Sequence, residues 1–144
     1  MKIKELLDKK GYGVYDISPE AKVSGVVDIL VRFNIGDVLV LDHRHKLVGI
    51  VSERDVIRKC IYQKRRLDDV MVSEIMTKDL IVAFPEDDLE YVLGIMTQNR
   101  IRHVPIIKKE GDLVGLVSIG DLAKGLLHEK EVENRYLRDY ISGP

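Results

Sequence analysis

The seven residues Gly49–Asp55, which read GIVSERD, decide the fold because Gly115–Asp121 repeat them as GLVSIGD. Carried along the chain without a gap, the same offset of 66 residues aligns residues 14–61 with residues 80–127, and twelve of the 48 pairs are identical. Ordinary composition would give roughly three identities. Self-similarity at a fixed interval indicates that one structural unit occurs twice, so the sequence predicts a tandem of two copies.

Each copy is predicted to fold as strand–helix–strand–strand–helix. Short apolar segments suit strands, an apolar stripe at helical spacing indicates the first helix, and a polar turn between two strands indicates a hairpin. The predicted strands are residues 14–17, 37–41 and 46–51 in the first copy and 80–83, 103–107 and 113–117 in the second. Two helices are predicted in each copy. The first begins at Pro19 in copy one, where Ser18 caps it, and at Pro85 in copy two. The second runs over about 53–63 in copy one and about 119–128 in copy two.

The expected fold class is α+β, with two tandem β-α-β-β-α repeats packed by pseudo-two-fold symmetry. One unit alone would leave an apolar sheet face and an apolar helix stripe uncovered, and pairing buries both. Short helical extensions are predicted at both ends, and the C-terminal one must dock on the body of its own chain or on a second subunit. The predicted boundaries are 8–62 for repeat 1, 63–75 for a linker helix, 76–128 for repeat 2, and 129–144 for a C-terminal amphipathic helix.

Composition favours a globular cytoplasmic protein. The chain of 144 residues is 45% hydrophobic and 33% charged, with a formal net charge of −1, which gives no general attraction to nucleic acid or to an anionic membrane. Its apolar runs are too short to span a bilayer. Cys60 is the single cysteine, which excludes an internal disulfide and favours a reducing compartment.

The start of the last helix in the second copy gathers polar side chains suited to a nucleotide. Antiparallel strands run back on each other, which is predicted to bring Arg102 and His103 near Ser118 and Asp121. A helix N-terminus favours an anion, and a hydroxyl at its cap can join the N–H donors on a phosphate. A carboxylate three residues later accepts two hydrogen bonds side by side, which suits the two hydroxyls of a ribose.

The first copy has the same arrangement, but an aspartate lies near its helix start where the second copy has a histidine. Gly36 and Asp37 are predicted to lie near Ser52, Arg54 and Asp55. Asp37 would repel a phosphate unless Arg54 offsets its charge, whereas the second copy adds favourable charge. The second copy is therefore predicted to be at least as good a phosphate site as the first.

A structural role competes with this interpretation. Ser-x-x-Asp at a helix start is a common capping box, and a single copy would more often be structural. Two copies at one offset favour binding, and the small Gly49 and Gly115 before them would let a flat base approach the sheet. His43 and His45 lie in a polar turn without an acid or cysteine partner, so we expect no metal site. No nucleophile–base pair indicates catalysis.

The two units, each closed by the pattern G-h-h-S-x-x-D (h, apolar), resemble a tandem of cystathionine-β-synthase (CBS) domains, a Bateman module of the small stand-alone bacterial type. Residues 76–85 and 99–106 are also similar to the family pattern, and the resemblance covers residues 8–128. It implies an adenosine ligand (AMP, ADP, ATP, NAD(H) or S-adenosylmethionine) in the clefts between paired repeats. It also implies a homodimer that regulates an unidentified partner protein.

The resemblance further implies roles for individual residues. The acids would hold the ribose, the serines the phosphates, and the basic residues would add charge, while apolar residues flank the adenine. The acids are Asp55 and Asp121, and the serines are Ser52 and Ser118. The basic residues are Arg54, or Arg102 with His103, and the apolar residues are Val82, Ala83 and Ile101. We expect a non-enzymatic nucleotide sensor. The alternatives are a scaffold that uses the fold only for association, with empty clefts, and an enzyme that acts on a nucleotide.

Overall fold

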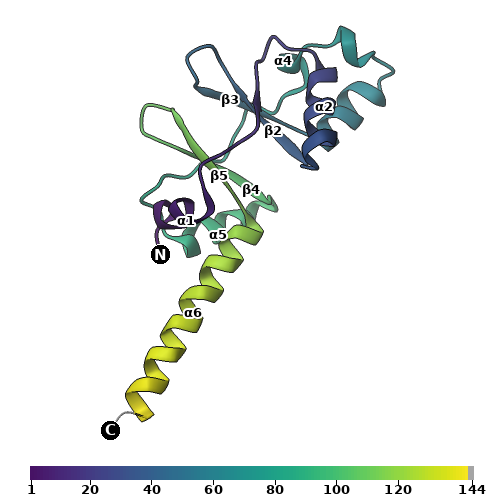
Figure 1. Ribbon diagram of the computed structural model, residues 1–144. Coiled ribbons are helices and arrows are strands. Elements are labelled where there is room, and N and C mark those ends of the chain that lie inside the picture. The colour runs from purple at the N-terminus through teal and green to yellow at the C-terminus, as the bar shows by residue number, and fades with distance from the viewer. Residues whose placement is uncertain (143–144) are drawn as a thin grey trace. The chain divides into compact units, whose positions relative to one another are not determined.

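A computed structural model describes residues 1–142 of the chain, which divide into two compact units (Figure 1). The repeat-1 unit comprises Gly13–Ile81 with Glu110–Leu113. The repeat-2 unit comprises Met1–Tyr12, Val82–Lys109 and the chain from Val114 onward. Each unit has its own apolar core, so the mixed α+β architecture of two tandem repeats predicted from the sequence is confirmed.

The repeat-1 unit is built on a three-stranded sheet in the order β1-β2-β3. Strand β1 lies parallel to β2, and β3 lies antiparallel to β2. Apolar residues of α2, including Val23 and Val26, pack with Val38 and Val51 of the sheet to form the core. The elements in chain order are β1 (Asp16–Ile17), α2 (Val23–Phe33), β2 (Asp37–Leu41), β3 (Leu47–Ser52), α3 (Glu53–Val56), the π-helix η1 (Ile57–Ile61), the 3₁₀ helix η2 (Leu67–Asp69) and α4 (Val72–Ile75).

The repeat-2 unit holds the second hairpin and the longest helix. Its core gathers Leu89, Met96, Ile106 and Leu122 with Leu7 of the N-terminal helix. Its elements are α1 (Ile3–Lys10), α5 (Leu89–Asn99), β4 (His103–Ile107), β5 (Leu113–Ser118) and α6 (Ile119–Ser142). The predicted N-terminal amphipathic helix is confirmed as α1, which buries Ile3, Leu6 and Leu7.

The helix that precedes each repeat packs in the unit of the other repeat. Helix α1 precedes repeat 1 but belongs to the repeat-2 unit, where Lys2 forms an antiparallel bridge with Asp88. Helix α4 precedes repeat 2 but belongs to the repeat-1 unit, where Met71 bridges Lys22 in the same way. Each compact unit is thus completed by a helix that lies outside the strand–helix–strand–strand–helix repeat it packs on.

These bridges explain why both first helices begin later than predicted. Helix α2 begins at Val23 instead of Pro19, and α5 begins at Leu89 instead of Pro85. Lys22 and Asp88, which precede them, are held extended by the bridges, so the chain cannot become helical earlier. The first helical N–H groups bond to the backbone of the bridging segments and not to a side-chain cap.

Three other expectations about secondary structure are wrong. Residues 80–83 form no strand, and only Ala83 makes a parallel bridge, to Ile106. Residues 63–75 contain η2 and α4 instead of one linker helix. Helix α6 runs without a break past residue 128, because this segment has no proline and is rich in good helix formers. The last two residues of the predicted helix 129–144 lie outside the described part of the chain.

Candidate functional site

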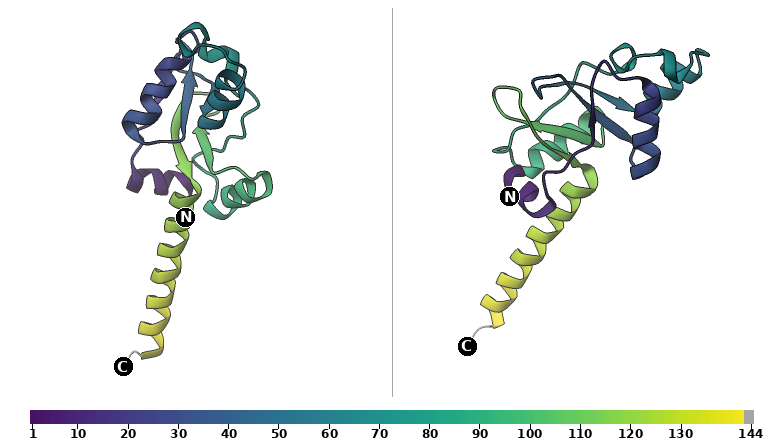
Figure 2. Two further views of the ribbon diagram at one scale, coloured as in Figure 1. Left: turned by 90° about the vertical axis from the view of Figure 1, so that its right-hand side faces the viewer. Right: turned by 45° about the horizontal axis from the view of Figure 1, so that its top comes forward.

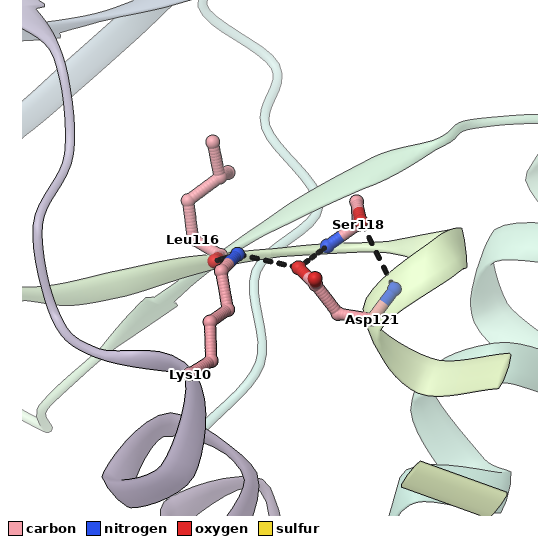
Figure 3. A network of polar contacts seen from close by, with 4 residues as sticks. All are labelled: Lys10, Leu116, Ser118 and Asp121. Carbon is pink, nitrogen blue, oxygen red and sulfur yellow. Dashed lines mark hydrogen bonds and ion pairs between the residues drawn. The ribbon is translucent and has the colours of Figure 1, made fainter. Parts of the chain in front are cut away.

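Both Ser-x-x-Asp motifs form capping boxes. Ser52 Oγ accepts a hydrogen bond from Asp55 N at 3.1 Å, and Asp55 Oδ2 accepts one from Ser52 N at 2.9 Å. Ser118 and Asp121 repeat the pair at 3.1 and 2.8 Å (Figure 3). The structural role that competed with binding is therefore present in both copies. It also orients each carboxylate at a helix start.

Each carboxylate also has a cationic partner from its own unit, and neither lysine is among the residues predicted to form the site. Asp55 of α3 pairs at 3.0 Å with Lys59, which lies four residues further along the chain in η1. Asp121 pairs with Lys10 from the end of α1, and the same ammonium donates to Leu116 O at 2.6 Å (Figure 3). The pairing of Lys59 with Asp55 could be predicted from the sequence, because residues four apart in a helical segment are neighbours. No local pattern links Lys10 to Asp121, which is 111 residues away.

These partners decide the protonation of Asp121. Burial by itself would raise the pKa of this carboxyl, but hydrogen bonds from the Lys10 ammonium and the Ser118 N–H outweigh it, and the pKa lies below its ordinary value of 3.8. The group is therefore ionised at neutral pH. An oriented, ionised carboxylate can accept two hydrogen bonds from a diol, although a ribose must share it with Lys10 or displace Lys10.

Replacing Lys10 by methionine is expected to raise the pKa of Asp121, because the ammonium favours the ionised form. A carboxyl whose folded pKa is depressed adds stability above its unfolded pKa and loses it as the pH falls through the folded value. The deficit in unfolding free energy of Lys10→Met should thus be larger at pH 7 than below pH 3.8. An NMR titration of the Asp121 carboxyl carbon tests the shift, with Lys9→Met as the matched control; an equal rise in the control would contradict this account.

The predicted adjacency of hairpin ends and helix starts is confirmed. Glu53 N donates to Gly36 O at 3.0 Å, and Ile119 N donates to Arg102 O at 2.8 Å. These bonds occupy the first N–H of each helix, so fewer backbone donors remain for an anion than the sequence suggested. The side chains of Arg54 and Arg102 are exposed, and His103 is half-buried.

The residues expected to flank a base are less favourably placed. Ala83 is buried in the core of the repeat-2 unit, and both its backbone groups bond to β4. Val82 and Ile101, in the same unit, are half-buried. Of the residues expected to bind ligand, Ser52, Arg54 and Asp55 belong to the repeat-1 unit and the others to the repeat-2 unit.

The space beside the strand glycines is filled by the chain itself, so the expectation that they admit a flat base is wrong. A Cβ atom on Gly49 would lie 2.7 Å from Met76 Sδ, and one on Gly115 would lie 3.1 Å from Leu7 Cδ2. Leu7 belongs to α1, and Met76 directly follows α4. The glycines therefore allow those segments to pack closely on the strands.

A hollow of about 320 Å³ remains beside Asp121 within the repeat-2 unit. This volume falls at the lower end of the range for small-molecule sites. The hollow is rich in cationic groups, which suits an anionic ligand. It is lined by Met1, Leu6, Lys9, Lys10, Asp121, Lys124, Gly125 and His128.

Two further features bear on the chemistry of the chain. Over residues 1–142, no group of three or more His, Cys, Asp or Glu side chains is arranged to hold a metal ion. In the same residues, none of the helices combines the length and apolar character needed to cross a membrane.

Comparison with known proteins gives a consistent result. The model of the family described as CBS domain matches residues 13–62 and 72–128. The mitochondrial CBS domain-containing protein CBSX3 of Arabidopsis thaliana is 38% identical over 125 residues, which are 84% of this chain and 60% of that protein. This chain thus spans less than two thirds of that relative.

Solved structures of similar proteins match the fold over most of the chain. The CBS-domain containing protein ATU1752 from Agrobacterium tumefaciens has a TM-score of 0.77 and 33% identity, covering 87% of this chain and 98% of that one. The CBS domain protein PAE2072 from Pyrobaculum aerophilum, solved in complex with AMP, has a TM-score of 0.74 and 27% identity, covering 84% and 89%. Since the family model matches both repeats and most of the sequence, this chain belongs to the CBS domain family.

Proposed function

We propose that this protein is a non-enzymatic regulatory protein that binds an adenine nucleotide at its Ser-x-x-Asp helix starts. One observation carries the proposal. Asp121 is ionised, oriented by its capping box, and borders a hollow that is also lined by Lys9 and Lys124. A diol-binding carboxylate beside cationic side chains suits the ribose and phosphate of a nucleotide.

The base of the ligand is inferred from similarity. The structure of the Pyrobaculum aerophilum relative was solved with AMP, and it shares the fold of this chain over most of its length. We extend adenine recognition to this chain on that ground. By the roles that the resemblance implies, Asp121 would hold the ribose, Ser118 with Arg102 and His103 the phosphate, and Val82 and Ile101 the base. Of these residues, Asp121 is the one that lines the hollow. Ser52, Arg54 and Asp55 would serve the same roles in repeat 1.

Regulation would follow from differential binding. A ligand that binds one conformation more tightly shifts the population toward it and changes the surface offered to a partner protein. The unidentified partner would be controlled in this way. Catalysis is not part of the proposal, because both carboxylates are engaged in capping boxes and in ion pairs with lysine.

A thermal-shift screen tests the proposal. We expect one or more of AMP, ADP, ATP, NAD(H) and S-adenosylmethionine to raise the Tm, while GMP and GTP at equal concentration serve as controls for the base. A ligand at 100 times its Kd adds about 2.7 kcal/mol, which corresponds to several degrees for a chain of this size. A response to none of these compounds would favour the ligand-free scaffold. Conversion of the ligand during incubation, followed by chromatography, would favour an enzyme.

A further inference from the structure

In repeat 2, a side chain bonds to a carbonyl whose counterpart in repeat 1 is bonded by the backbone. Lys10 Nζ donates to Leu116 O at 2.6 Å and pairs with Asp121 (Figure 3). The counterpart of Leu116 at the offset of 66 residues is Ile50, whose carbonyl accepts from Thr77 N at 2.8 Å in an antiparallel bridge. A backbone bridge is fixed by the path of the chain, whereas a lysine side chain is flexible and its donors rotate. The contact in repeat 2 can therefore open without moving the backbone.

The cation beside Asp121 comes from α1, and the equivalent position of α6 is a glycine. In repeat 1, Asp55 pairs with Lys59, and the counterpart of Lys59 is Gly125. A Cβ atom on Gly125 would lie 2.7 Å from Leu89 Cδ1, so the core of the repeat-2 unit leaves little room for a side chain there. Repeat 2 thus ties its carboxylate to a helix that lies outside the repeat.

Helix α1 does not depend on Lys10 for its place. It lies beside the first half of α6 (Figure 2) and buries three of its side chains. Ile3 N and Lys4 N also donate to backbone carbonyls within residues 85–87, at 2.9 Å each. Lys10 is the last residue of the helix, so its ammonium can leave Asp121 while α1 stays docked.

The hollow beside Asp121 gives the displaced side chain a place to go. Lys10 is one of the residues that line this hollow of about 320 Å³, and its side chain is 32% exposed. The ammonium would keep contact with water there, so its displacement does not leave a buried charge unpaired. Ion pairs that water can reach contribute little to stability, so a ligand can compete with this one.

We infer that Lys10 is an internal competitor for the repeat-2 site, which a ribose must displace to use both oxygens of Asp121. Asp121 Oδ2 accepts from Ser118 N and from Lys10, so a diol that spans the two carboxylate oxygens meets the ammonium. The apparent affinity is then reduced by the fraction of molecules in which Asp121 is available. This inference rests on the proposed function, because it takes Asp121 as the group that holds the ribose. It adds a link from the ligand to α1, whose end is released when the ligand binds.

Calorimetry with adenosine tests the competition in the full chain. Every protein carries Asp55→Asn, so that repeat 1 contributes little to the binding. We expect Lys10→Met to bind adenosine about fivefold more tightly than the parent that keeps Lys10, since a fivefold change corresponds to about 1 kcal/mol, the upper value for an ion pair near the surface. Lys10→Arg keeps the charge and should show no gain. Lys46→Met is the matched control, because Lys46 also bonds to a carboxylate and a backbone carbonyl, those of Asp112 and Glu110.

A second ligand separates competition from a general change in the site. 2′-Deoxyadenosine lacks one of the two hydroxyls, so it should gain nothing from Lys10→Met. Equal gains for both ligands, or no gain for adenosine, overturn the inference, while AMP binding by the wild-type chain would still support the proposed function. If no adenosine compound binds any of these proteins, the proposed function fails and the inference fails with it.

NMR of the lysine side chains tests the displacement without replacing Lys10, and so does not depend on the folding of Lys10→Met. Saturating adenosine should shift the side-chain signals of Lys10 in the Asp55→Asn protein and leave those of Lys46 unchanged. The Lys46 ammonium makes bonds of the same kind, at 2.7 and 2.8 Å, but belongs to the repeat-1 unit. An unchanged Lys10 signal at saturation would show that the ligand and the ammonium do not compete.

Discussion

The double variant Asp55→Ala, Asp121→Ala is expected to lose measurable affinity for the adenine nucleotide that the thermal-shift screen identifies. Hydrogen bonds to charged groups contribute about 1.5–3 kcal/mol each, so each substitution should weaken binding about 10- to 150-fold at its own site. Asp121→Ala alone should affect the repeat-2 unit, and Asp55→Ala alone the repeat-1 unit. Isothermal titration calorimetry measures both Kd values.

The variants must separate a lost ligand contact from a lost helix cap. Asp55→Asn, Asp121→Asn keeps an oxygen that accepts the serine N–H but removes the negative charge, so it preserves the caps seen at 2.9 and 2.8 Å. The matched control for charge is Asp28→Ala, Asp69→Ala, two surface aspartates that each pair with an arginine three or four residues away. Binding unchanged in both the alanine and the asparagine variants would show that these carboxylates do not hold the ribose.

Replacing Leu89 by alanine is expected to destabilise the protein by about 2–5 kcal/mol, the usual cost of removing a large aliphatic side chain from a core. Leu89 is fully buried at the first position of α5. Its packing is close, since a Cβ atom on Gly125 of α6 would lie 2.7 Å from Leu89 Cδ1. Urea denaturation followed by circular dichroism measures the change in unfolding free energy.

Leu127→Ala provides the matched control, because it removes the same atoms from α6 at a side chain that is 64% exposed. Its effect should stay within about 0.5 kcal/mol. A loss below about 1 kcal/mol for Leu89→Ala would mean that the core of the repeat-2 unit does not depend on the contact between α5 and α6.

The hairpins and the caps could be predicted because they are local. Asp37 lies opposite Ser52 in β2 and β3, and the last helix of each copy begins directly after its strand. The bonds involved join residues close in sequence, where turn composition and side-chain type determine the geometry. The capping boxes at Ser52 and Ser118 are predictable for that reason.

The helix starts and the neighbours of the carboxylates could not be predicted in the same way. Helix α2 begins at Val23, directly after the bridge between Lys22 and Met71. Helix α5 begins at Leu89, directly after the bridge between Asp88 and Lys2. Local signals, a serine followed by proline in the first copy and a proline in the second, indicate a start four residues earlier in each copy. Tertiary pairing overrode them, because satisfying backbone groups in a bridge is worth more than a weak start signal.

The sequence by itself determined that one α+β unit occurs twice and that each copy ends in a serine and an aspartate at a helix start. Only the tertiary structure decided which segments complete each unit. Helix α1 supplies Leu7 beside Gly115 and Lys10 to Asp121, and the segment that ends in Met76 packs beside Gly49. The physical reason is range: a repeat is visible in residue order, whereas such contacts between segments distant in sequence depend on which apolar surfaces each unit leaves to be covered.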